Sequence, residues 1–503
     1  MGVVQRDAAK TTILSFVGLS LGYLNKAVLF VALLTTEQVG LLNLVITVSM
    51  LFAQLSNLGT IYSTWRFFPF FRNESKGHYG FLLMNILLVL IGVSIFAFLI
   101  LAFNGPIVEY YNKKSPLFTS YYLWVIPLGI ANVFFLIFES YLRGLFKNVL
   151  PVFLQEIFLR LLVLTGLILL SFKVIDFHQF FIFHALVYFI PSLILLVYLV
   201  QLKELSFSIS SITVPRRFRK ILISFSFFSY FNTLATMLVI SMDAMMIASY
   251  IGLSATGVYT TMIYLTSALM VPYRSIIRVS STFVAKHWKE RNLIALQELY
   301  QKSSSVGLLI GLLGFLVIFV PIHELFTFIK DYKSGIYVFV ILMVGRILDM
   351  YSGLNGTIFS TSRKFKYDLY FTILLCVMVF TMNLWLIPKF GINGAAISTS
   401  FAYVAYNVLR CYYVYHLFRL QPFNWSQFKL IALFFAFLGL VEVLEYFQVF
   451  EDMNVIHTIV LKEILVFSGF IFPVYFFNLE PEIISYSKSM YQKLKGIIRK
   501  SKN

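Results

Sequence analysis

Charged residues inside long apolar segments are the parts of this sequence whose side chains could do chemistry. A charge at the centre of a bilayer costs roughly 2.5–3.5 kcal/mol on insertion scales, so such residues mark binding, coupling or ion pairing. The basic residues of this kind are Lys26, Arg160, Arg274, Arg278, Arg346, Arg410 and Lys462.

Some of these cations have an acidic partner close in sequence. Opposite charges three or four residues apart meet on one face of a helix and can neutralise each other inside a bundle. The pairs are Glu156 with Arg160, Arg346 with Asp349, and Lys462 with the adjacent Glu463. We interpret them as structural, and Arg346 with Asp349 is also a candidate for coupling or gating. Arg410 has no acid one helical turn away, so we expect it to snorkel to the cytoplasmic interface.

Lys26, Arg274 and Arg278 have no such partner. Arg274 and Arg278 are four residues apart and share one helix face. Tyr264 and Ser267 lie on the same face, which is too polar for lipid and should line a cavity. Two guanidinium forks joined by an ammonium suit a phosphate or pyrophosphate group. The alternative is that Arg278 snorkels to the cytoplasmic interface.

Asp243 is the acidic residue that stands out, because no basic residue lies within one helical turn of it. It shares a helix face with Asn232 and Thr236. We predict that Lys26 pairs with Asp243 across the cavity and that this gating pair opens when substrate or a proton arrives. Asn25, next to Lys26, and Asn232 complete the predicted substrate-binding set.

The composition excludes an ordinary soluble protein. Hydrophobic residues make up 59% of the chain and charged residues only 12%, and the mean hydropathy is +0.85, whereas soluble chains are about a quarter charged. The net charge of +18 would suggest nucleic acid in a soluble protein, but here we expect no nucleic-acid partner. Cys376 and Cys411 lie in apolar runs, so neither is expected to form a disulfide or bind a metal.

Catalytic signatures do not occur in the sequence. It contains no glycine-rich phosphate loop, no GxSxG, no HExxH and no His spacing typical of metal ligands. We therefore expect a transporter rather than an enzyme, with no catalytic residue, cofactor or metal site.

Apolar runs long enough to cross a bilayer recur along the whole chain, about fourteen in all. They predict an all-α polytopic membrane protein. The first run is long and lacks a small-residue cleavage site, so it is expected to remain as the first span. The runs are 11–34, 40–63, 80–104, 117–143, 150–172, 179–202, 218–250, 256–282, 303–328, 335–360, 367–388, 393–418, 428–447 and 455–477.

The distribution of Lys and Arg over the connections sets the expected orientation. Basic residues concentrate in cytoplasmic connections of membrane proteins. If both termini are cytoplasmic, the great majority of connecting Lys and Arg lie on that side. Those on the other side are Lys113, Lys114, Lys173, Lys330, Lys333 and Lys389.

Residues 284–300 and 482–499 are predicted to be interfacial helices. Both carry apolar residues at helical spacing with basic residues between them, a pattern typical of helices at the headgroup level. The alternative is a solvated amphipathic loop helix in each case.

An internal repeat relates the two halves. The turn at 34–51 resembles the turn at 250–269, and aligning Gly40 with Gly257 sets an offset that also makes Asp243 the counterpart of Lys26. A repeat of six helices keeps the orientation of both halves and predicts a pseudo-two-fold axis along the membrane normal.

Several motifs resemble those of one transporter superfamily. The segment LWLIPKFGINGAAISTSFAY (384–403) is similar to the "IPxxGixGAA" signature between helices eleven and twelve of polysaccharide-export flippases. The turns at Gly40 and at Gly257–Val258–Tyr259 resemble the recurring "GxY" element, and LSNLGTIYSTWRFFPFF (55–71) resembles the end of the second helix. These proteins belong to the multidrug/oligosaccharidyl-lipid/polysaccharide (MOP) superfamily, which includes the multidrug and toxin extrusion (MATE) transporters.

This resemblance implies two six-helix bundles around a V-shaped cavity, plus two extra helices. The expected parts are an N-terminal bundle at 1–202, a basic cytoplasmic linker at 203–220, a second bundle at 221–420, and the last two helices with an amphipathic tail at 421–503. It also implies a flippase of the bacterial cytoplasmic (inner) membrane that moves an undecaprenyl-diphosphate-linked oligosaccharide by alternating access. The oligosaccharide would be a repeat unit of O-antigen, capsule or exopolysaccharide.

Basic residues of the first and eighth helices line the cavity of the related lipid II flippases. Lys26, Arg274 and Arg278 match them by helix and charge, which favours an anionic cargo. Expected partners are membrane lipids, a proton or sodium ion for coupling, and polysaccharide polymerase and chain-length proteins. The alternatives are a MATE-type exporter of drugs or anionic metabolites and, less favoured, a polytopic glycan polymerase or acyltransferase.

Overall fold

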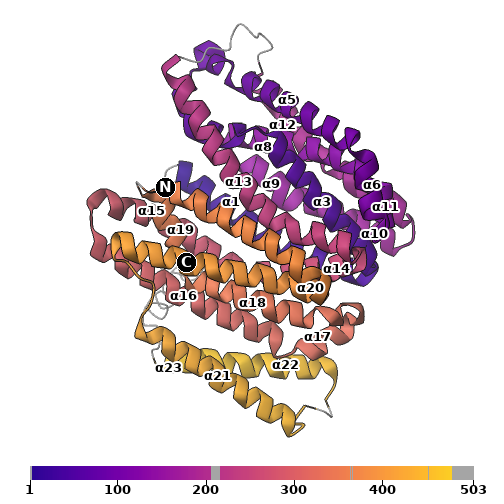
Figure 1. The fold of residues 1–503 in the computed structure, drawn as a ribbon, viewed down its shortest axis with the longest axis vertical. Helices are drawn as coiled ribbons and strands as arrows, with labels where there is room; N and C mark the ends of the chain where they lie inside the picture. Colours follow the sequence, from indigo (N-terminus) through magenta and orange to yellow (C-terminus); the bar gives the residue numbers. More distant parts are fainter. Residues whose placement is uncertain (1–2, 206–215, 363, 365, 451–452, 478–503) are drawn as a thin grey trace, which may run out of the picture. The chain divides into compact units, whose positions relative to one another are not determined.

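The computed structural model describes residues 3–205, 216–362, 364, 366–450 and 453–477. These residues form helices and connecting turns, without a strand (Figure 1). The backbone contacts divide the chain into two compact units. Unit 1 contains residues 1–264 and 376–395, and unit 2 contains residues 265–375 and 396–503.

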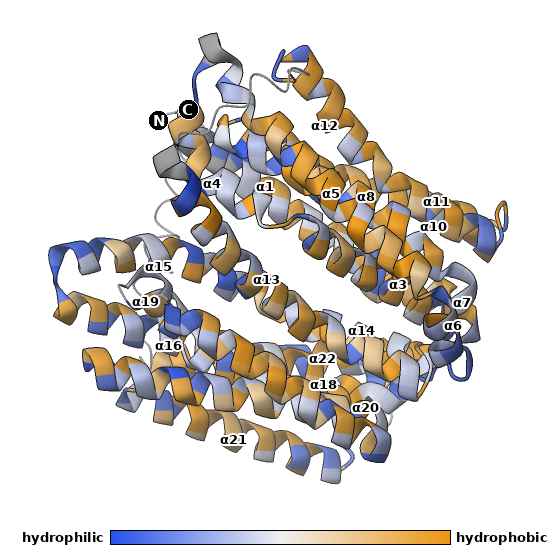
Figure 2. Cartoon of the chain, turned by 45° about the horizontal axis from the view of Figure 1, so that its top comes forward, coloured by the Kyte–Doolittle hydropathy of each residue, from blue (hydrophilic) through white to orange (hydrophobic). Residues whose placement is uncertain are grey.

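Unit 1 is built around helix α8 (Val125–Gly144), which packs against α3 (Thr36–Ser56), α4 (Thr60–Phe71), α5 (Phe81–Ala102) and α12 (Phe189–Gln201) (Figure 1). Apolar residues dominate these helices (Figure 2). Many of their large side chains are buried in one continuous core. The remaining helices of this unit are α1 (Val3–Tyr23), α2 (Phe30–Leu33), α6 (Asn104–Asn112), α7 (Pro116–Tyr121), α9 (Val149–Phe153), α10 (Leu159–Ser171), α11 (Phe177–Val187) and α13 (Arg216–Tyr250), with most of α14 (Leu253–Leu269).

Unit 2 is organised around α16 (Leu293–Phe319). This helix packs against α15 (Val271–Glu290), α18 (Ile336–Tyr351), α21 (Trp425–Tyr446) and α22 (Val455–Val466). The unit also holds α17 (Ile322–Phe328), α19 (Asn355–Thr361), both ends of α20 (Lys366–Phe418) and α23 (Phe472–Phe476), while residues 376–395 of α20 belong to unit 1.

Twelve helices within the described residues are long and apolar enough to cross a membrane. One of them, α20, has 53 residues and consists of two helices that meet at Gly391, where φ is 59° and ψ is −137°. Helices α14 and α15 follow one another across Met270 and cover the run predicted at 256–282. The prediction of an all-α protein with about fourteen crossings is therefore confirmed, and the "IPxxGixGAA"-like signature lies at the break in α20.

Local sequence signals start several of these helices. Capping boxes, in which a side chain and a backbone N–H are bonded reciprocally, precede α3, α11 and α21. Each has a Gln three residues after the capping Thr, Asp or Asn. The pairs are Thr35 with Gln38, Asp176 with Gln179, and Asn424 with Gln427.

The segment 284–300 is not the single interfacial helix that its amphipathic pattern predicts. Helix α15 ends at Glu290, Arg291 is left-handed with φ 53°, and the Asn292 side chain caps the start of α16. Leu296 and Tyr300 are fully buried inside unit 2, whereas Leu293 and Ile294 are exposed, so the apolar residues of the segment do not form one lipid-facing stripe. The other predicted interfacial helix, 482–499, lies outside the described residues. Of the predicted linker 203–220, residues 216–220 already belong to α13.

The repeat is visible as a reciprocal contact inside unit 1. A Cβ on Gly40 would lie 2.0 Å from the carbonyl oxygen of Leu253, and a Cβ on Gly257 would lie 2.0 Å from that of Thr36. The side chain of Asn43 donates a hydrogen bond of 3.1 Å to Thr260, a residue 217 positions later. The same separation relates Gly40 to Gly257 and Thr36 to Leu253. Residues that are equivalent under the repeat thus touch each other, as a two-fold axis through α3 and α14 requires.

A buried ion cluster joins the last two helices to the rest of unit 2. The Lys462 ammonium is 2% exposed and lies 2.9 Å from Glu324 Oε1 and 2.8 Å from Glu445 Oε1. The structural role predicted for Lys462 is consistent with this, but its partners come from α17 and α21 and not from the adjacent Glu463.

Lys462→Met is expected to lower the free energy of unfolding by about 3 kcal/mol, because two carboxylates lose their shared cation in a poorly solvated place. Thermal unfolding of the purified protein measures this loss. Lys429→Met removes an exposed cation from α21 and should leave the unfolding temperature unchanged. Equal unfolding temperatures for the two variants would show that the cluster is not stabilising.

Candidate functional site

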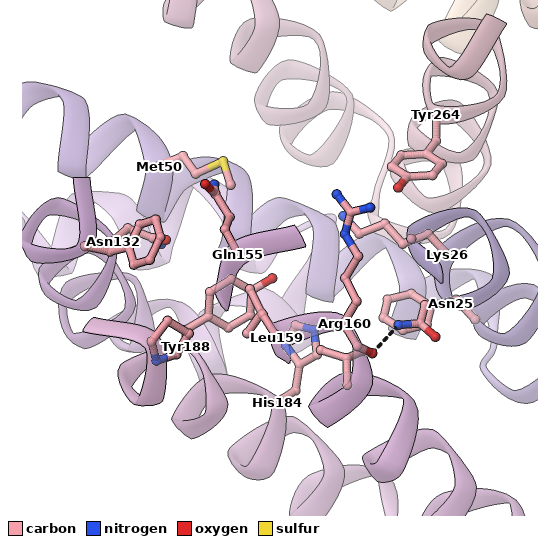
Figure 3. Close-up of a pocket in the computed structure, with 15 residues that line it drawn as sticks. Asn25, Lys26, Met50, Asn132, Gln155, Leu159, Arg160, His184, Tyr188 and Tyr264 are labelled. Atoms are coloured by element: carbon pink, nitrogen blue, oxygen red, sulfur yellow. Dashed lines mark hydrogen bonds between the residues drawn. The ribbon is translucent and has the colours of Figure 1, made fainter. Parts of the chain in front are cut away.

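A polar cavity of about 260 Å³ lies inside unit 1 (Figure 3). Its lining combines cationic, amide and aromatic groups with a few aliphatic side chains. The lining residues are Gly22, Asn25, Lys26, Phe30, Met50, Asn132, Phe135, Gln155, Leu159, Arg160, Val163, His184, Tyr188, Pro191 and Tyr264.

Two π-helical turns deliver polar residues to this cavity. The turn Leu24–Leu29 interrupts the first spanning helix and carries Asn25 and Lys26, and the turn Leu154–Phe158 interrupts the fifth and carries Gln155. An extra residue in a helical turn shifts the faces that follow, and such turns occur often at functional sites. Here the shift turns amide and ammonium groups toward the cavity and away from lipid.

Lys26 and Arg160 provide two positive charges to the cavity. Figure 3 shows their side chains converging beneath Tyr264. The Lys26 ammonium lies 5.3 Å from the centre of the Tyr264 ring, and it interacts electrostatically with both Arg160 and His184. Tyr264 thus offers a cation–π contact, as its predicted position on the cavity face suggests.

Arg160 is only partly neutralised. Its Nη2 lies 2.6 Å from Glu156 Oε2, which confirms the pair predicted from the spacing of these residues. Its Nη1 is buried and has no hydrogen-bond partner. A Cβ on Gly22 would lie 2.8 Å from this atom, so the glycine makes room for the guanidinium.

Two amide side chains add unsatisfied groups to the same cavity. Asn25 is 3% exposed, and its Nδ2 donates a hydrogen bond of 2.8 Å to the carbonyl oxygen of Arg160, while its Oδ1 is buried without a partner. The Nδ2 of Asn132 is likewise buried and unpartnered. Buried polar atoms without a partner are costly, and they favour a polar ligand or water in this space.

Gly22→Ala is expected to weaken binding of an anion in this cavity by about tenfold, because the new methyl group displaces the Arg160 guanidinium from its position. Binding of farnesyl diphosphate to the purified protein measures the change. Gly105→Ala is the matched control, since nothing lies within 4 Å of the Cβ position there. Equal affinity of both variants would mean that the position of the guanidinium is unimportant.

The predicted arginines of the eighth crossing belong to unit 2. Arg274 and Arg278 lie on α15 and are both exposed. Arg274 interacts electrostatically with Arg346 and Asp349 on α18. The sequence-predicted binding and coupling residues of unit 2 therefore gather in one region. That Lys26 shares a cavity with these arginines stays a prediction.

Asp349 is part of a hydrogen-bonded network within unit 2. Its Oδ1 accepts a bond of 2.8 Å from Asn407 Nδ2, and the Asn407 Oδ1 accepts bonds from Ser352 and Asn355. The Arg346 guanidinium lies 5.4 Å from the centre of the Tyr403 ring. A gating role for Arg346 and Asp349 stays a prediction.

Asp243 is 2% exposed in unit 1 and is tied to two neighbouring helices. Its carboxylate accepts hydrogen bonds from Tyr259 Oη (2.5 Å) and Asn383 Nδ2 (2.7 Å). Asn232 lies on the same helix, α13, with a buried and unpartnered Oδ1. The gating pair of Lys26 with Asp243 also stays a prediction.

Arg410 does not snorkel to the interface as predicted. It is 8% exposed, forms an ion pair with Asp368 within α20, and lies 4.4 Å from the centre of the Tyr406 ring. The helix reversal at Gly391 brings this distant acid to Arg410, so spacing along one helix could not show the pair.

Among the described residues no group of His, Cys, Asp and Glu could hold a metal ion. The sequence reasoning missed Arg160, Asn132, Gln155 and His184 as cavity residues. One signal was present: Gly18 and Gly22 are four residues apart, as are Glu156 and Arg160. Such small residues let two helices approach closely, and a Cβ on Gly18 would lie 2.5 Å from the carbonyl oxygen of Glu156.

Solved structures of membrane transporters share the fold of this chain. The lipid II flippase MurJ in an inward closed conformation matches with a TM-score of 0.71 and 15% identity, over 93% of this chain and 98% of that chain. An inward-facing multidrug resistance transporter of the MATE family and MOP superfamily matches with a TM-score of 0.64 and 15% identity, over 78% and 93%. A MOP superfamily transporter from Pyrococcus furiosus, described by the reverse polarity of its binding pocket, matches with a TM-score of 0.57 and 15% identity, over 82% and 95%.

No family profile and no curated protein matches the sequence. The chain therefore has the fold of MOP superfamily transporters, as the motifs predict, and is a multi-pass membrane protein.

Proposed function

We propose that this protein is a flippase that moves an undecaprenyl-diphosphate-linked oligosaccharide across the bacterial cytoplasmic membrane by alternating access. The observation that carries the proposal is the cavity of unit 1. Lys26 and Arg160 both line it, and Glu156 pairs with Arg160, so one positive charge remains for an anionic group.

The low-dielectric surroundings make this charge effective. Cations that face a cavity between apolar helices attract a phosphate more strongly than exposed cations do. Arg160 can offer a fork of donors and Lys26 a point charge, the two modes in which proteins bind phosphate. The exposed Arg274 and Arg278 of unit 2 are proposed as further contacts for the same anionic cargo.

The similarity to MurJ supports a lipid-linked cargo, because that protein is a lipid II flippase with the same fold along nearly its whole length. The distribution of Lys and Arg supports cytoplasmic termini. A proton or sodium ion is the proposed coupling ion, and Asp243, Arg346 and Asp349 are proposed to respond to it. Polymerase and chain-length proteins are proposed partners that consume the translocated unit.

An exporter of anionic metabolites is the second candidate. The same basic cavity fits it, and MATE transporters share the fold. Lys26 in the first helix argues against a cationic drug, because it would repel the charge of the drug from the cavity.

Deletion of the gene separates these functions. The flippase proposal expects a lipid-linked repeat unit to accumulate on the cytoplasmic face of the membrane, as shown by extraction and mass spectrometry of lipid-linked glycans. Return of the gene should clear this intermediate. Unchanged lipid-linked glycans together with altered drug or metabolite export would contradict the proposal.

A further inference from the structure

We propose that Glu156 acts as an internal substitute for the substrate's phosphate: it occupies Arg160 in the empty cavity and is displaced when a diphosphate binds. The inference rests on the proposed function and adds to it a residue that sets which anions are accepted.

Arg160 is positioned through both its backbone and its side chain. Asn25 bonds to its main-chain carbonyl at 2.8 Å, and the guanidinium packs over Gly22, where a Cβ would lie 2.8 Å from Nη1. Nη1 remains buried without a partner, whereas Nη2 bonds to Glu156. One half of the guanidinium fork is thus already occupied by a carboxylate oxygen, and the other half has no acceptor.

Glu156 is placed so that its side chain can leave while its backbone stays. The π-helical turn Leu154–Phe158 carries it, and Gly18 packs tightly against its carbonyl oxygen. The side chain itself is 28% exposed. In the otherwise similar pair Glu139–Arg143 of α8, the acid is only 11% exposed. Glu156 can therefore swing away from Arg160, whereas Glu139 is confined.

The charge of the cavity changes with this exchange. With Glu156 in place, the local sum of Lys26, Arg160 and Glu156 is one positive charge. Once Glu156 has moved away, an incoming anion meets two cations. A singly charged phosphodiester gains little by replacing one carboxylate with another monoanion. A diphosphate that joins a lipid to a saccharide carries two negative charges and can neutralise both cations, with its oxygens bound to both halves of the fork.

The exchange predicts selectivity for lipid diphosphates over singly charged phosphodiester lipids. The exchange also helps the ligand to dissociate. Glu156 competes with the ligand for Arg160, so the affinity is lower than Lys26 and Arg160 would give without Glu156. A carrier needs such competition, since a ligand that binds too tightly is not released on the other side.

The test uses the full-length protein in nanodiscs with two probes, farnesyl diphosphate and the singly charged phosphodiester farnesyl methyl phosphate. Glu156→Gln keeps the size of the side chain and removes its charge. We expect it to tighten diphosphate binding by about tenfold and phosphodiester binding by more, because in the wild type a single negative charge gains little by replacing Glu156. Selectivity for the diphosphate should therefore shrink, while translocation slows because release is slower.

Arg160→Gln should weaken diphosphate binding by about tenfold or more. In the double variant Glu156→Gln/Arg160→Gln, the gain from losing Glu156 should disappear, because Glu156 acts only through Arg160. Glu290→Gln is the matched control, since Glu290 pairs with Lys286 at the same spacing in unit 2, outside the cavity lining, and it should leave both affinities unchanged.

The outcomes separate this inference from the proposed function. Unchanged or weaker binding in Glu156→Gln, or an equal gain in the double variant, would overturn the exchange while the flippase proposal stands. Failure of the wild-type protein to bind either probe would instead count against the proposed function itself.

Discussion

Lys26→Gln is expected to reduce translocation of a lipid diphosphate by about a hundredfold. The change removes one of the two cations of the unit 1 cavity while keeping a polar side chain of similar length. A hydrogen bond to a charged group contributes about 1.5–3 kcal/mol, and about 1.4 kcal/mol corresponds to a factor of ten in binding. Rescue of the deletion strain and translocation by the purified protein measure the loss.

The matched control for this prediction is Lys10→Gln. Lys10 lies in the same first spanning helix but is exposed and does not line the cavity. We expect it to support normal translocation. Near-normal translocation by Lys26→Gln, with the variant present at wild-type levels in the membrane, would remove Lys26 from the site.

Gly257→Val is expected to lower the free energy of unfolding by about 3 kcal/mol or more and to abolish transport. Its Cβ would lie 2.0 Å from a backbone oxygen of Thr36, which cannot rotate away, so α3 and α14 must separate. Because the contact is reciprocal, Gly40→Val should have a similar effect, and the double variant should cost less than the sum of both. Thermal unfolding and expression in the membrane measure these losses.

Gly439→Ala is the matched control for the helix crossing. Nothing lies within 4 Å of its Cβ position in α21, and alanine favours a helix over glycine by about 1 kcal/mol. We expect an unchanged or slightly raised unfolding temperature. A stable, active Gly257→Val protein would contradict the close crossing of α3 and α14.

Hydropathy and the internal repeat predicted the fold, because span length and internal symmetry leave patterns in the sequence that do not depend on side-chain packing. A span needs about 20 apolar residues, and such runs are visible without any knowledge of packing. The offset that aligns Gly40 with Gly257 predicted a relation that the structure shows as a physical contact. The two matched halves and the terminal segment, as bounded from the sequence, stay predictions.

The site was predicted less completely, because it depends on residues that come together from distant segments. Lys26 and Asn25 were found, since an unpaired cation in a span is conspicuous. Arg160 was interpreted as structural because Glu156 lies one turn away, yet the π-helical turn and Gly22 place it in the cavity. Helix periodicity assumes regular turns, so it cannot foresee where a π-helical turn redirects a face.

Pairing across the fold was the other source of error. Arg410 pairs with Asp368, 42 residues away, although no acid lies one helical turn from it. Lys462 pairs with Glu324, 138 residues away, and not with the adjacent Glu463 that the sequence suggested. The amphipathic pattern of 284–300 was correct as a pattern but was assigned to lipid, because a buried face inside unit 2 and an interfacial face look the same in sequence.

The most direct measurement of the central claim is translocation by the purified protein in proteoliposomes. A fluorescent undecaprenyl-diphosphate saccharide is placed in one leaflet, and a membrane-impermeant quencher reports its arrival in the other. We predict movement of this lipid by the wild-type protein, a strong loss with Lys26→Gln, and no movement of the matching undecaprenyl monophosphate saccharide. Equal movement of both lipids, or movement that is independent of Lys26, would contradict the account.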